Sequence, residues 1–350
     1  MAFTTVVRVL VAVFSLGWAT SAQAQLQLNG AGATFPYPIY SKWFSLYTQV
    51  DPSVRFNYQS IGSGGGIKQI MERTTDFGAT DGPMTDEQMR AAPRHILHFP
   101  TVMGAVVLTY NVEGVPKGLR LTPEAIADVF LGKITKWNDP ALVASNPGTS
   151  LPNRDIVVVH RSDGSGTSYI FTDYLSKISK EWRNKVGKST SVNWPVGLGG
   201  KGNEGVTGLV KQTPLSVGYV ELIYALSNDL PYAVVKNQAG TFVTPSLDSV
   251  TAAASGFSAS MPEDFRVFIT DAPGPEAYPI SGMTWLLVYE KQEDAEKGKK
   301  IVQFLDWMLR DGQKSAPDLH YAPLPAAVVT KARAAVRKVT LLDGTPLLDK

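Results

Sequence analysis

Residues 156–168 read IVVVHRSDGSGTS, and this stretch decides the class of fold. The apolar run Ile156–Val159 predicts a buried strand. A glycine-rich turn follows it, and Ser168 opens a segment with helical periodicity. A strand that leads through such a turn into a helix is the building unit of an α/β fold. Arg161 therefore falls at the carboxyl end of a strand, where open α/β sheets bind their ligands.

Strand-like runs alternate with helical patterns along the rest of the chain, which predicts an α/β protein. The expected strands are Val54–Gln59, Val102–Tyr110, Ile156–His160, Val217–Val220, Tyr232–Val235 and Thr284–Tyr289. The expected helices are Ile39–Thr48, Ile67–Arg73, Pro123–Leu131, Ser168–Lys185, Val206–Gln212, Lys299–Leu309 and Ala326–Val336. Thr122 precedes Pro123 and is expected to cap its helix. The runs Val102–Tyr110 and Thr284–Tyr289 are long enough to cross between two domains.

Composition excludes several classes of protein. The chain has 350 residues, which suggests two domains at about 150 residues each. Its 33 Lys and Arg against 31 Asp and Glu argue against a protein that coats nucleic acid or an acidic membrane. The absence of cysteine excludes a disulfide framework, thiolate metal sites and a cysteine nucleophile. None of the 4 histidines has metal-ligand spacing, so we expect no metal and no cofactor.

The first 24 residues have the pattern of a secretory signal peptide. Arg8 is their one charged side chain, Val9–Trp18 is apolar, and Ala22-Gln23-Ala24 has the small residues that a signal peptidase recognises. The apolar run is shorter than the roughly 20 residues that span a bilayer, and an uncleaved anchor is the alternative. We therefore expect an exported protein whose mature chain begins near Gln25.

Four glycine-rich turns each lead into a predicted helix. They span residues 30–36 (GAGATFP), 62–66 (GSGGG), 161–168 (RSDGSGTS) and 197–203 (GLGGKGN). The first N–H groups of a helix are unpaired and carry partial positive charge, so they suit anions. Any one of these turns is explained as an ordinary helix cap. Together, three with hydroxyl side chains and one with Arg161, they favour a shared oxyanion site.

The turns do not match the nucleotide-binding motifs. No G-x-x-x-x-G-K-[ST] loop is present, and residues 30–36 continue into proline instead of a dinucleotide-binding helix. The planar guanidinium of Arg161 suits bidentate contact with an oxyanion, and a surface ion pair with Asp163 is the alternative. Asp81 precedes a Gly-Pro pair, so it either shapes a turn or accepts a hydrogen bond from a proton-bearing ligand oxygen.

Four segments carry a family resemblance: GAGATFP at 30–36, GSGGGIKQI at 62–70, DFGATDGP at 76–83 and RSDGSGTS at 161–168. Together they closely resemble the periplasmic phosphate-binding proteins, the substrate-binding subunits of high-affinity phosphate ABC transporters. The likeness runs through nearly the whole mature chain. It includes LGKI at 131–134, WPVGLGGKGN at 194–203 and VGYVE at 217–221.

The resemblance implies a two-lobed α/β fold of the type 2, Venus-flytrap kind, in which each lobe is a mixed sheet flanked by helices. Lobe 1 is expected to comprise residues 25–105 and 281–350, and lobe 2 residues 106–280. The lobes are expected to close around one inorganic phosphate, which the protein delivers to the permease subunits of an ABC transporter at the inner membrane. The resemblance implies a monomer that is not an enzyme, holds no cofactor and binds no nucleic acid.

Carried over by motif, the phosphate contacts fall on eight residues: Thr34, Phe35, Ser63, Asp81, Arg161, Ser165, Gly166 and Thr167. Phe35 is expected to contribute its backbone N–H, and Asp81 is the one acceptor. The chain departs from the family at Gly64, where a second serine is common. The turn at residues 197–203 resembles a structural segment of the family and is assigned no ligand role.

Two other functions remain open on the sequence. One is a receptor for another tetrahedral oxyanion or a small phosphorylated compound. The other is a secreted phosphatase or serine hydrolase that uses Ser165. Against the enzyme, Ser165 lacks an evident histidine and acid arrangement, and the context DGSGT at 163–167 is not a G-x-S-x-G elbow.

Overall fold

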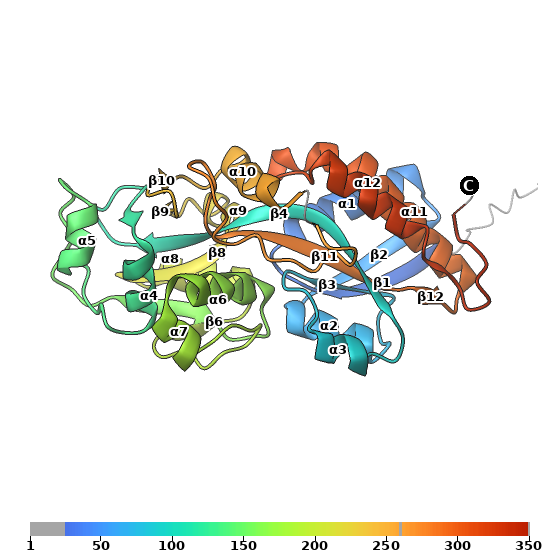
Figure 1. Cartoon of the computed structure of the whole chain (residues 1–350), viewed down its shortest axis with the longest axis horizontal. Coiled ribbons are helices and arrows are strands. Elements are labelled where there is room, and N and C mark those ends of the chain that lie inside the picture. Colours follow the sequence, from blue (N-terminus) through green and yellow to red (C-terminus); the bar gives the residue numbers. More distant parts are fainter. Residues whose placement is uncertain (1–24, 259–260, 349–350) are drawn as a thin grey trace, which may run out of the picture.

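The computed structural model describes residues 25–258 and 261–348, so the predicted signal peptide at residues 1–24 lies outside the described residues. The molecule is elongated, with two halves joined end to end by the long strands β4 and β11 (Figure 1). The first half contains α1, α2, α3, α11 and α12, and the second contains α4 to α8. This arrangement places the turns of one half opposite those of the other.

The bounds of the elements are as follows. The strands are β1 (Leu26–Gly32), β2 (Val54–Ser60), β3 (Phe77–Thr80), β4 (Ile96–Asn111), β5 (Arg120–Leu121), β6 (Val157–Arg161), β7 (Leu198–Gly200), β8 (Ser216–Glu221), β9 (Val234–Lys236), β10 (Phe242–Val243), β11 (Ser281–Tyr289), β12 (Lys291–Gln292) and β13 (Thr340–Leu341). The helices are α1 (Tyr37–Val50), α2 (Ser63–Met71), α3 (Asp86–Ala91), α4 (Pro123–Phe130), α5 (Pro140–Ser145), α6 (Gly166–Ile178), α7 (Lys180–Lys185), α8 (Gly202–Gln212), α9 (Leu222–Leu226), α10 (Leu247–Ser258), α11 (Ala295–Arg310) and α12 (Ala326–Val336), with the 3-10 helices η1 (Gly312–Ser315) and η2 (Pro317–Leu319).

Strand β4 connects the two halves within one mixed sheet of order β2-β1-β3-β11-β4-β8-β6-β7. From Ile96 to Ala105 it pairs antiparallel with β11, and from Val106 to Asn111 it pairs antiparallel with β8. The partner of β4 therefore changes between Ala105 and Val106. On either side of β4, the β1–β2 and β6–β7 pairs are parallel, as expected where helices connect the strands.

Most predicted elements are confirmed, and the predicted cap at Thr122 accepts a hydrogen bond from Ala125 N. The prediction of a single helix over Ser168–Lys185 is wrong, because the segment divides into α6 and α7 at Ser179. The extended backbone of Ser179 ends α6, and its hydroxyl accepts a hydrogen bond from Trp182 N and caps α7. Strands β1 and β3 and helix α10 were not predicted. The glycine- and alanine-rich sequences of β1 and β3 resemble turns. They form strands because they are buried against neighbouring strands, and not because of their local propensity.

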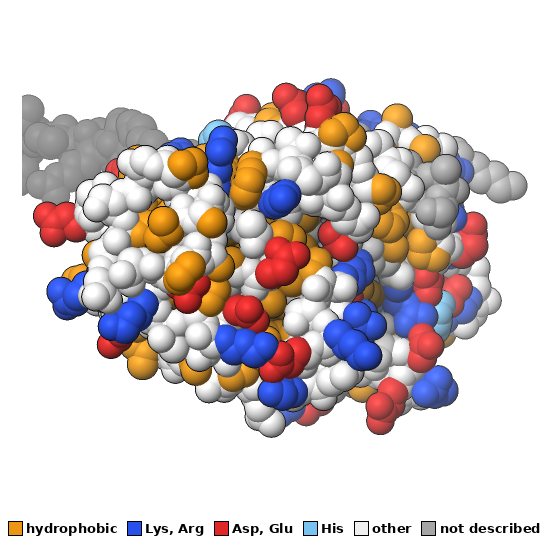
Figure 2. Space-filling model, turned by 60° about the vertical axis from the view of Figure 1, so that its left-hand side comes forward, with side chains coloured by type: hydrophobic (Ala, Val, Ile, Leu, Met, Phe, Trp, Pro, Cys, Tyr) orange, Lys and Arg blue, Asp and Glu red, His pale blue; other side chains and the backbone are white. Residues whose placement is uncertain are grey.

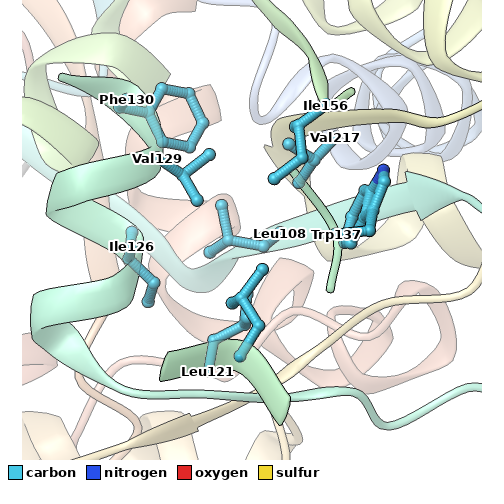
Figure 3. Close-up of a pocket in the computed structure, with 9 residues that line it drawn as sticks. Leu108, Leu121, Ile126, Val129, Phe130, Trp137, Ile156 and Val217 are labelled. Carbon is cyan, nitrogen blue, oxygen red and sulfur yellow. The ribbon is translucent and has the colours of Figure 1, made fainter. Parts of the chain in front are cut away.

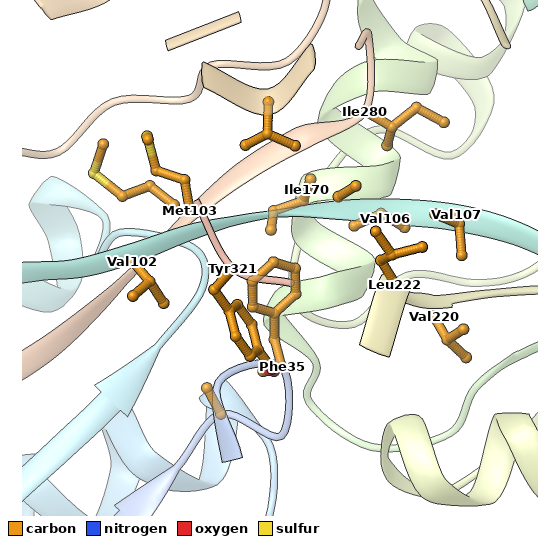
Figure 4. Packing of buried hydrophobic residues seen from close by; sticks show 14 of the residues in the cluster. Phe35, Val102, Met103, Val106, Val107, Ile170, Val220, Leu222, Ile280 and Tyr321 are labelled. Atoms are coloured by element: carbon orange, nitrogen blue, oxygen red, sulfur yellow. The ribbon is translucent and has the colours of Figure 1, made fainter. Parts of the chain in front are cut away.

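Large buried side chains pack around the point where β4 changes partner (Figure 4). Phe35 and Tyr321 lie next to each other beneath β4, with ring centroids 6.2 Å apart and no exposed surface. Val106 of β4 and Leu222 of α9 extend the same cluster into the second half. The turn that carries Phe35 is therefore fixed by the core and does not move freely on the surface.

The second half encloses a small apolar cavity of about 20 Å³. Figure 3 shows Leu108, Ile126, Val129, Trp137 and Val217 lining it, from β4, α4, the segment after α4 and β8. Its volume is about that of one water molecule, and a cavity with apolar walls stays dry. It is a packing gap in the core and not a ligand site.

Acidic and basic side chains lie interspersed on the face shown in Figure 2. Among its described residues, this face therefore shows no large patch of a single sign of charge. Within residues 25–258 and 261–348, no helix has the length and apolar character that a membrane crossing requires.

Candidate anion-binding site

Strand-turn-helix connections from both halves meet at one place. β1 leads into α1 and β2 into α2 in the first half, while β6 leads into α6 and β7 into α8 in the second. Gly64 N donates to Gly164 O at 2.8 Å, so the turns of the two halves are in direct contact. A Cβ on Gly64 would lie 3.0 Å from Gly164 Cα, so a side chain at this position would require the two turns to shift slightly apart. The N-termini of α2, α6 and α8 converge here and give the site a positive potential.

The turn between β1 and α1 holds Thr34 and Phe35, both buried. Tyr224 donates its hydroxyl to Thr34 O at 2.6 Å, and Tyr321 donates to Phe35 O at 2.6 Å. These two bonds hold both carbonyl groups of the turn. The peptide planes of the turn are therefore fixed. A turn that presents a backbone N–H to a ligand needs such a fixed orientation.

Asp81 lies at the end of β3 and is completely buried beside Ser63, the first residue of α2. Its Oδ1 accepts from Thr284 Oγ1 at 2.8 Å, and its backbone N donates to Ser63 Oγ at 3.0 Å. Burial raises the pKa of Asp81 to about 7, although Thr284, the charge of Arg161 and Ser63 oppose the shift. This carboxyl is therefore divided between its neutral and ionised forms near neutral pH.

Arg161 ends β6, as the sequence predicts, and its side chain is buried. Its backbone N donates to Tyr219 Oη at 3.1 Å, and its Nη1 donates to Thr167 Oγ1 at 3.3 Å. Two further bonds join its guanidinium to Asp163. The alternative, a surface ion pair with Asp163, is correct about the partner of Arg161. It is wrong about the location, because the pair is buried in the site and not on the surface. Burial acts to raise the pKa of Asp163, but the bonds and charge of Arg161 outweigh it and hold that pKa below its usual value.

Ser165, Gly166 and Thr167 form the start of α6, and all three are buried. Ser165 Oγ accepts from Ser168 N at 3.0 Å and caps the helix. A Cβ on Gly166 would lie 2.3 Å from Ser63 Oγ and 2.6 Å from Asp81 Cβ. Only glycine permits this approach, so Gly166 touches the first half directly.

The structure brings all eight predicted residues together in one buried site between the halves. Gly166 joins α6 to Ser63 and Asp81, while Asn203 joins Thr34 to Thr167 through hydrogen bonds to both hydroxyls. Asp81 is a completely buried carboxyl with no cation of the described residues directly bonded to it, and it lies among hydroxyl, guanidinium and helix N–H donors. Such a set binds an anion with several bare oxygens and one proton.

Sequence reasoning missed two side chains of this site, Asn203 and Thr284. Asn203 follows a glycine-rich turn after β7, the same pattern that marked the Arg161 turn, and this signal was available. Thr284 lies within β11, and nothing local distinguishes it from other strand residues. Among the described residues, no cluster of three or more His, Asp or Glu is arranged to hold a metal.

Comparison with known proteins gives the family. A model of the PBP superfamily domain matches residues 18–312. Phosphate-binding protein PstS of Haemophilus influenzae is 46% identical over 323 residues, covering 92% of this chain and 96% of that protein. The chain belongs to the phosphate-binding protein family. Phosphate-binding protein PstS of Pasteurella multocida is 45% identical over 340 residues, covering 97% of this chain and 98% of that protein.

Solved members of the phosphate-binding protein family share the fold. A high-affinity periplasmic phosphate-binding protein, PfluDING, solved with phosphate, superposes with a TM-score of 0.72 at 21% identity, covering 88% of this chain and 93% of that one. A substrate-binding protein of a putative phosphate ABC transporter from Clostridium perfringens, also with bound phosphate, gives 0.63 at 21% identity, covering 85% of this chain and all of that one. The predicted two-lobed periplasmic binding protein fold is confirmed.

Proposed function

We propose that this chain binds inorganic phosphate in the cleft between its two lobes and delivers it to the permease of an ABC transporter for import. The observation that carries the proposal is the balance of donors and acceptors in the buried site. Thr34, Ser63, Arg161 and Thr167 bring side-chain donors, and the helix N-termini add backbone N–H groups. Asp81 is the acceptor. Phosphate near neutral pH has bare oxygens for the donors and at least one P–OH for the acceptor.

The eight residues at the site are proposed to contact phosphate directly, with Phe35 and Gly166 acting through backbone N–H groups. Phosphate has five heavy atoms, and at a ceiling of about 1.5 kcal/mol per atom its binding reaches roughly 7.5 kcal/mol, a Kd of order micromolar. An affinity near that ceiling needs almost every oxygen to be saturated. A dehydrated anion enclosed by both lobes meets this requirement.

We assign residues 25–105 and 281–350 to lobe 1, and residues 106–280 to lobe 2. The change of β4 from β11 to β8 between Ala105 and Val106 supports the first boundary, and the start of β11 at Ser281 supports the second. The crossing strands then form the hinge about which the lobes close.

The chain is proposed to work as a monomer in the periplasm after removal of residues 1–24, and to have no enzymatic activity. The names of its relatives are those of binding proteins. Ser165 also lacks the setting of a nucleophile, because its hydroxyl accepts a hydrogen bond from Ser168 N as a helix cap and, within the described residues, makes none to an imidazole.

Anion-competition calorimetry on protein stripped of phosphate tests the function. The expected result is one phosphate per chain with micromolar or tighter affinity, and no displacement by excess sulfate. Equal affinity for sulfate, or no heat with phosphate, contradicts the proposal. Hydrolysis of a phosphate ester by the same preparation, abolished in Ser165→Ala, contradicts the assignment as a non-enzyme.

A further inference from the structure

Asn203 is completely buried near the start of α8, between the two lobes. Its Oδ1 accepts a hydrogen bond from Glu221 N at 2.9 Å. A backbone N–H can only donate, so this bond fixes the orientation of the amide. Nδ2 must therefore face the opposite way, where it lies 2.7 Å from Thr34 Oγ1 and 3.0 Å from Thr167 Oγ1.

Each of these hydroxyls has both of its acceptor positions filled. Thr34 Oγ1 accepts from Asn203 Nδ2 and from Asn203 N, the latter at 3.2 Å. Thr167 Oγ1 accepts from Asn203 Nδ2 and from Arg161 Nη1. A hydroxyl has two acceptor positions and one donor hydrogen. The one function left to each hydroxyl is to donate its O–H.

We propose that Asn203 is a positioning residue that makes Thr34 and Thr167 obligatory hydrogen-bond donors to the ligand. The bonds from Asn203 to Thr34 cross between the lobes and form only on closure, whereas the bonds that Thr167 accepts from Asn203 and Arg161 lie within lobe 2. The inference rests on the proposed binding of an oxyanion at this site. It adds a requirement on the ligand: the oxygens that face Thr34 and Thr167 are unprotonated.

The test is a mutant cycle read by calorimetry with inorganic phosphate. Asn203→Ala is expected to weaken phosphate binding about 10- to 100-fold, the worth of one or two hydrogen bonds to a charged group. Asn203→Asp keeps the shape but accepts instead of donating and adds a negative charge, so its loss is expected to be larger. In the Thr34→Val, Thr167→Val background, adding Asn203→Ala is expected to cost less than about threefold, because the hydroxyls through which Asn203 acts are already gone.

Asn146 provides a matched control. It is a buried asparagine of the same lobe. Its side-chain amide forms hydrogen bonds with Arg120 N, Arg120 O and Leu142 O, none of which belongs to a cleft residue. Asn146→Ala is expected to lower the melting temperature and leave phosphate affinity unchanged. Thermal unfolding of every variant verifies folding.

Two results overturn the inference. One is an Asn203→Ala variant that is folded and binds phosphate as tightly as wild type. The other is an undiminished loss from Asn203→Ala in the background without the two hydroxyls, since this means a direct contact or a general structural role. Failure of wild type itself to bind phosphate is a different outcome, which contradicts the proposed function and with it the inference.

Discussion

Arg161 and Asp163 are joined by two hydrogen bonds, Nε to Oδ1 at 2.8 Å and Nη2 to Oδ2 at 2.6 Å. Arginine has five N–H groups, and a third is occupied by Thr167 Oγ1. One hydrogen on each terminal nitrogen is left for the ligand. The carboxylate thus fixes the plane of the guanidinium and leaves its outer edge for two parallel bonds to an oxyanion.

Loss of Asp163 is expected to destabilise the phosphate-free protein. Asp163→Ala leaves the buried guanidinium of Arg161 without a counter-charge, which costs about 3–5 kcal/mol when one partner of a buried pair is removed. Bound phosphate supplies a replacement anion. We therefore expect a large fall in melting temperature without phosphate, most of which saturating phosphate restores.

The pair Asp264 and Arg266 is the control for this measurement. It has the same two-residue spacing and an Nε–Oδ2 distance of 2.7 Å, but its side chains are 47% and 22% exposed. Asp264→Ala is expected to cost under about 1 kcal/mol with or without phosphate. Equal destabilisation by both substitutions, or a loss in Asp163→Ala that phosphate does not repair, contradicts this account of the site.

Arg161→Ala is expected to weaken phosphate binding more than Lys201→Ala. Arg161 is buried and is proposed to contact the anion directly, and a hydrogen bond to a charged group is worth about 1.5–3 kcal/mol, or about 10- to 100-fold. Lys201 lies exposed at the N-terminal end of α8 and acts on the ligand only through solvent. Calorimetry of both variants at one pH and salt concentration measures the ranking, and equal losses contradict it.

Gly166→Ala is expected to prevent full closure. The new Cβ lies 2.3 Å from Ser63 Oγ and 2.6 Å from Asp81 Cβ, so the lobes must stay apart or shift. Overpacking of this size costs about 1–3 kcal/mol and lowers phosphate affinity about 10- to 100-fold. Small-angle scattering is expected to show compaction of wild type on addition of phosphate and less or none in the variant. Gly208→Ala, whose Cβ meets nothing within 4 Å, is expected to behave as wild type in both measurements.

The eight cleft residues were assigned through the family resemblance, and this was possible because each lies in a continuous sequence motif. Arg161 follows an apolar run, and Ser165 precedes a helical one. Asn203 was not predicted as a site residue because its role depends on Thr34, 169 positions away in the chain, and on Glu221 N to orient its amide. The glycine-rich turn before Asn203 marks the segment, but no local pattern encodes such a three-way contact.

The missed strands have a similar explanation. In β1, Gly32 is needed because a Cβ would lie 2.0 Å from Ala79 O of β3. The residue that looks like a turn former is in fact required by close contact between two strands. The long strands β4 and β11 were predicted from the length of their apolar runs alone. The change of partner within β4, from β11 to β8, could not be predicted, because it depends on which strands of the folded protein lie beside β4.

The last prediction concerns the proton on Asp81 and the exclusion of sulfate. Above its pKa of about 7 the carboxyl is ionised, accepts hydrogen bonds only, and repels the bare oxygen that sulfate must place there. Below that pKa the carboxyl is neutral and donates its O–H to the same oxygen. Sulfate stays fully ionised across this range, so the pH dependence of its binding reports Asp81 and not the ligand. We expect wild type to bind sulfate about tenfold more weakly at pH 8 than at pH 5, with uptake of nearly one proton per sulfate bound at pH 8 and almost none at pH 5.

Asp81→Asn is expected to remove this pH dependence and to narrow the gap between phosphate and sulfate, because an amide turns its N–H toward a bare oxygen at every pH. The opposing explanation is that Asp81 only shapes the turn before Gly82 and Pro83. On that explanation the substitution lowers the melting temperature, the ratio of the two affinities stays the same, and sulfate binding keeps its dependence on pH. Calorimetry with both anions at pH 5 and pH 8, with thermal unfolding of the same samples, distinguishes the two. Thr284→Val, which removes the hydroxyl that donates to Asp81 Oδ1, raises the pKa of the carboxyl further and is expected to shift the onset of sulfate binding to higher pH.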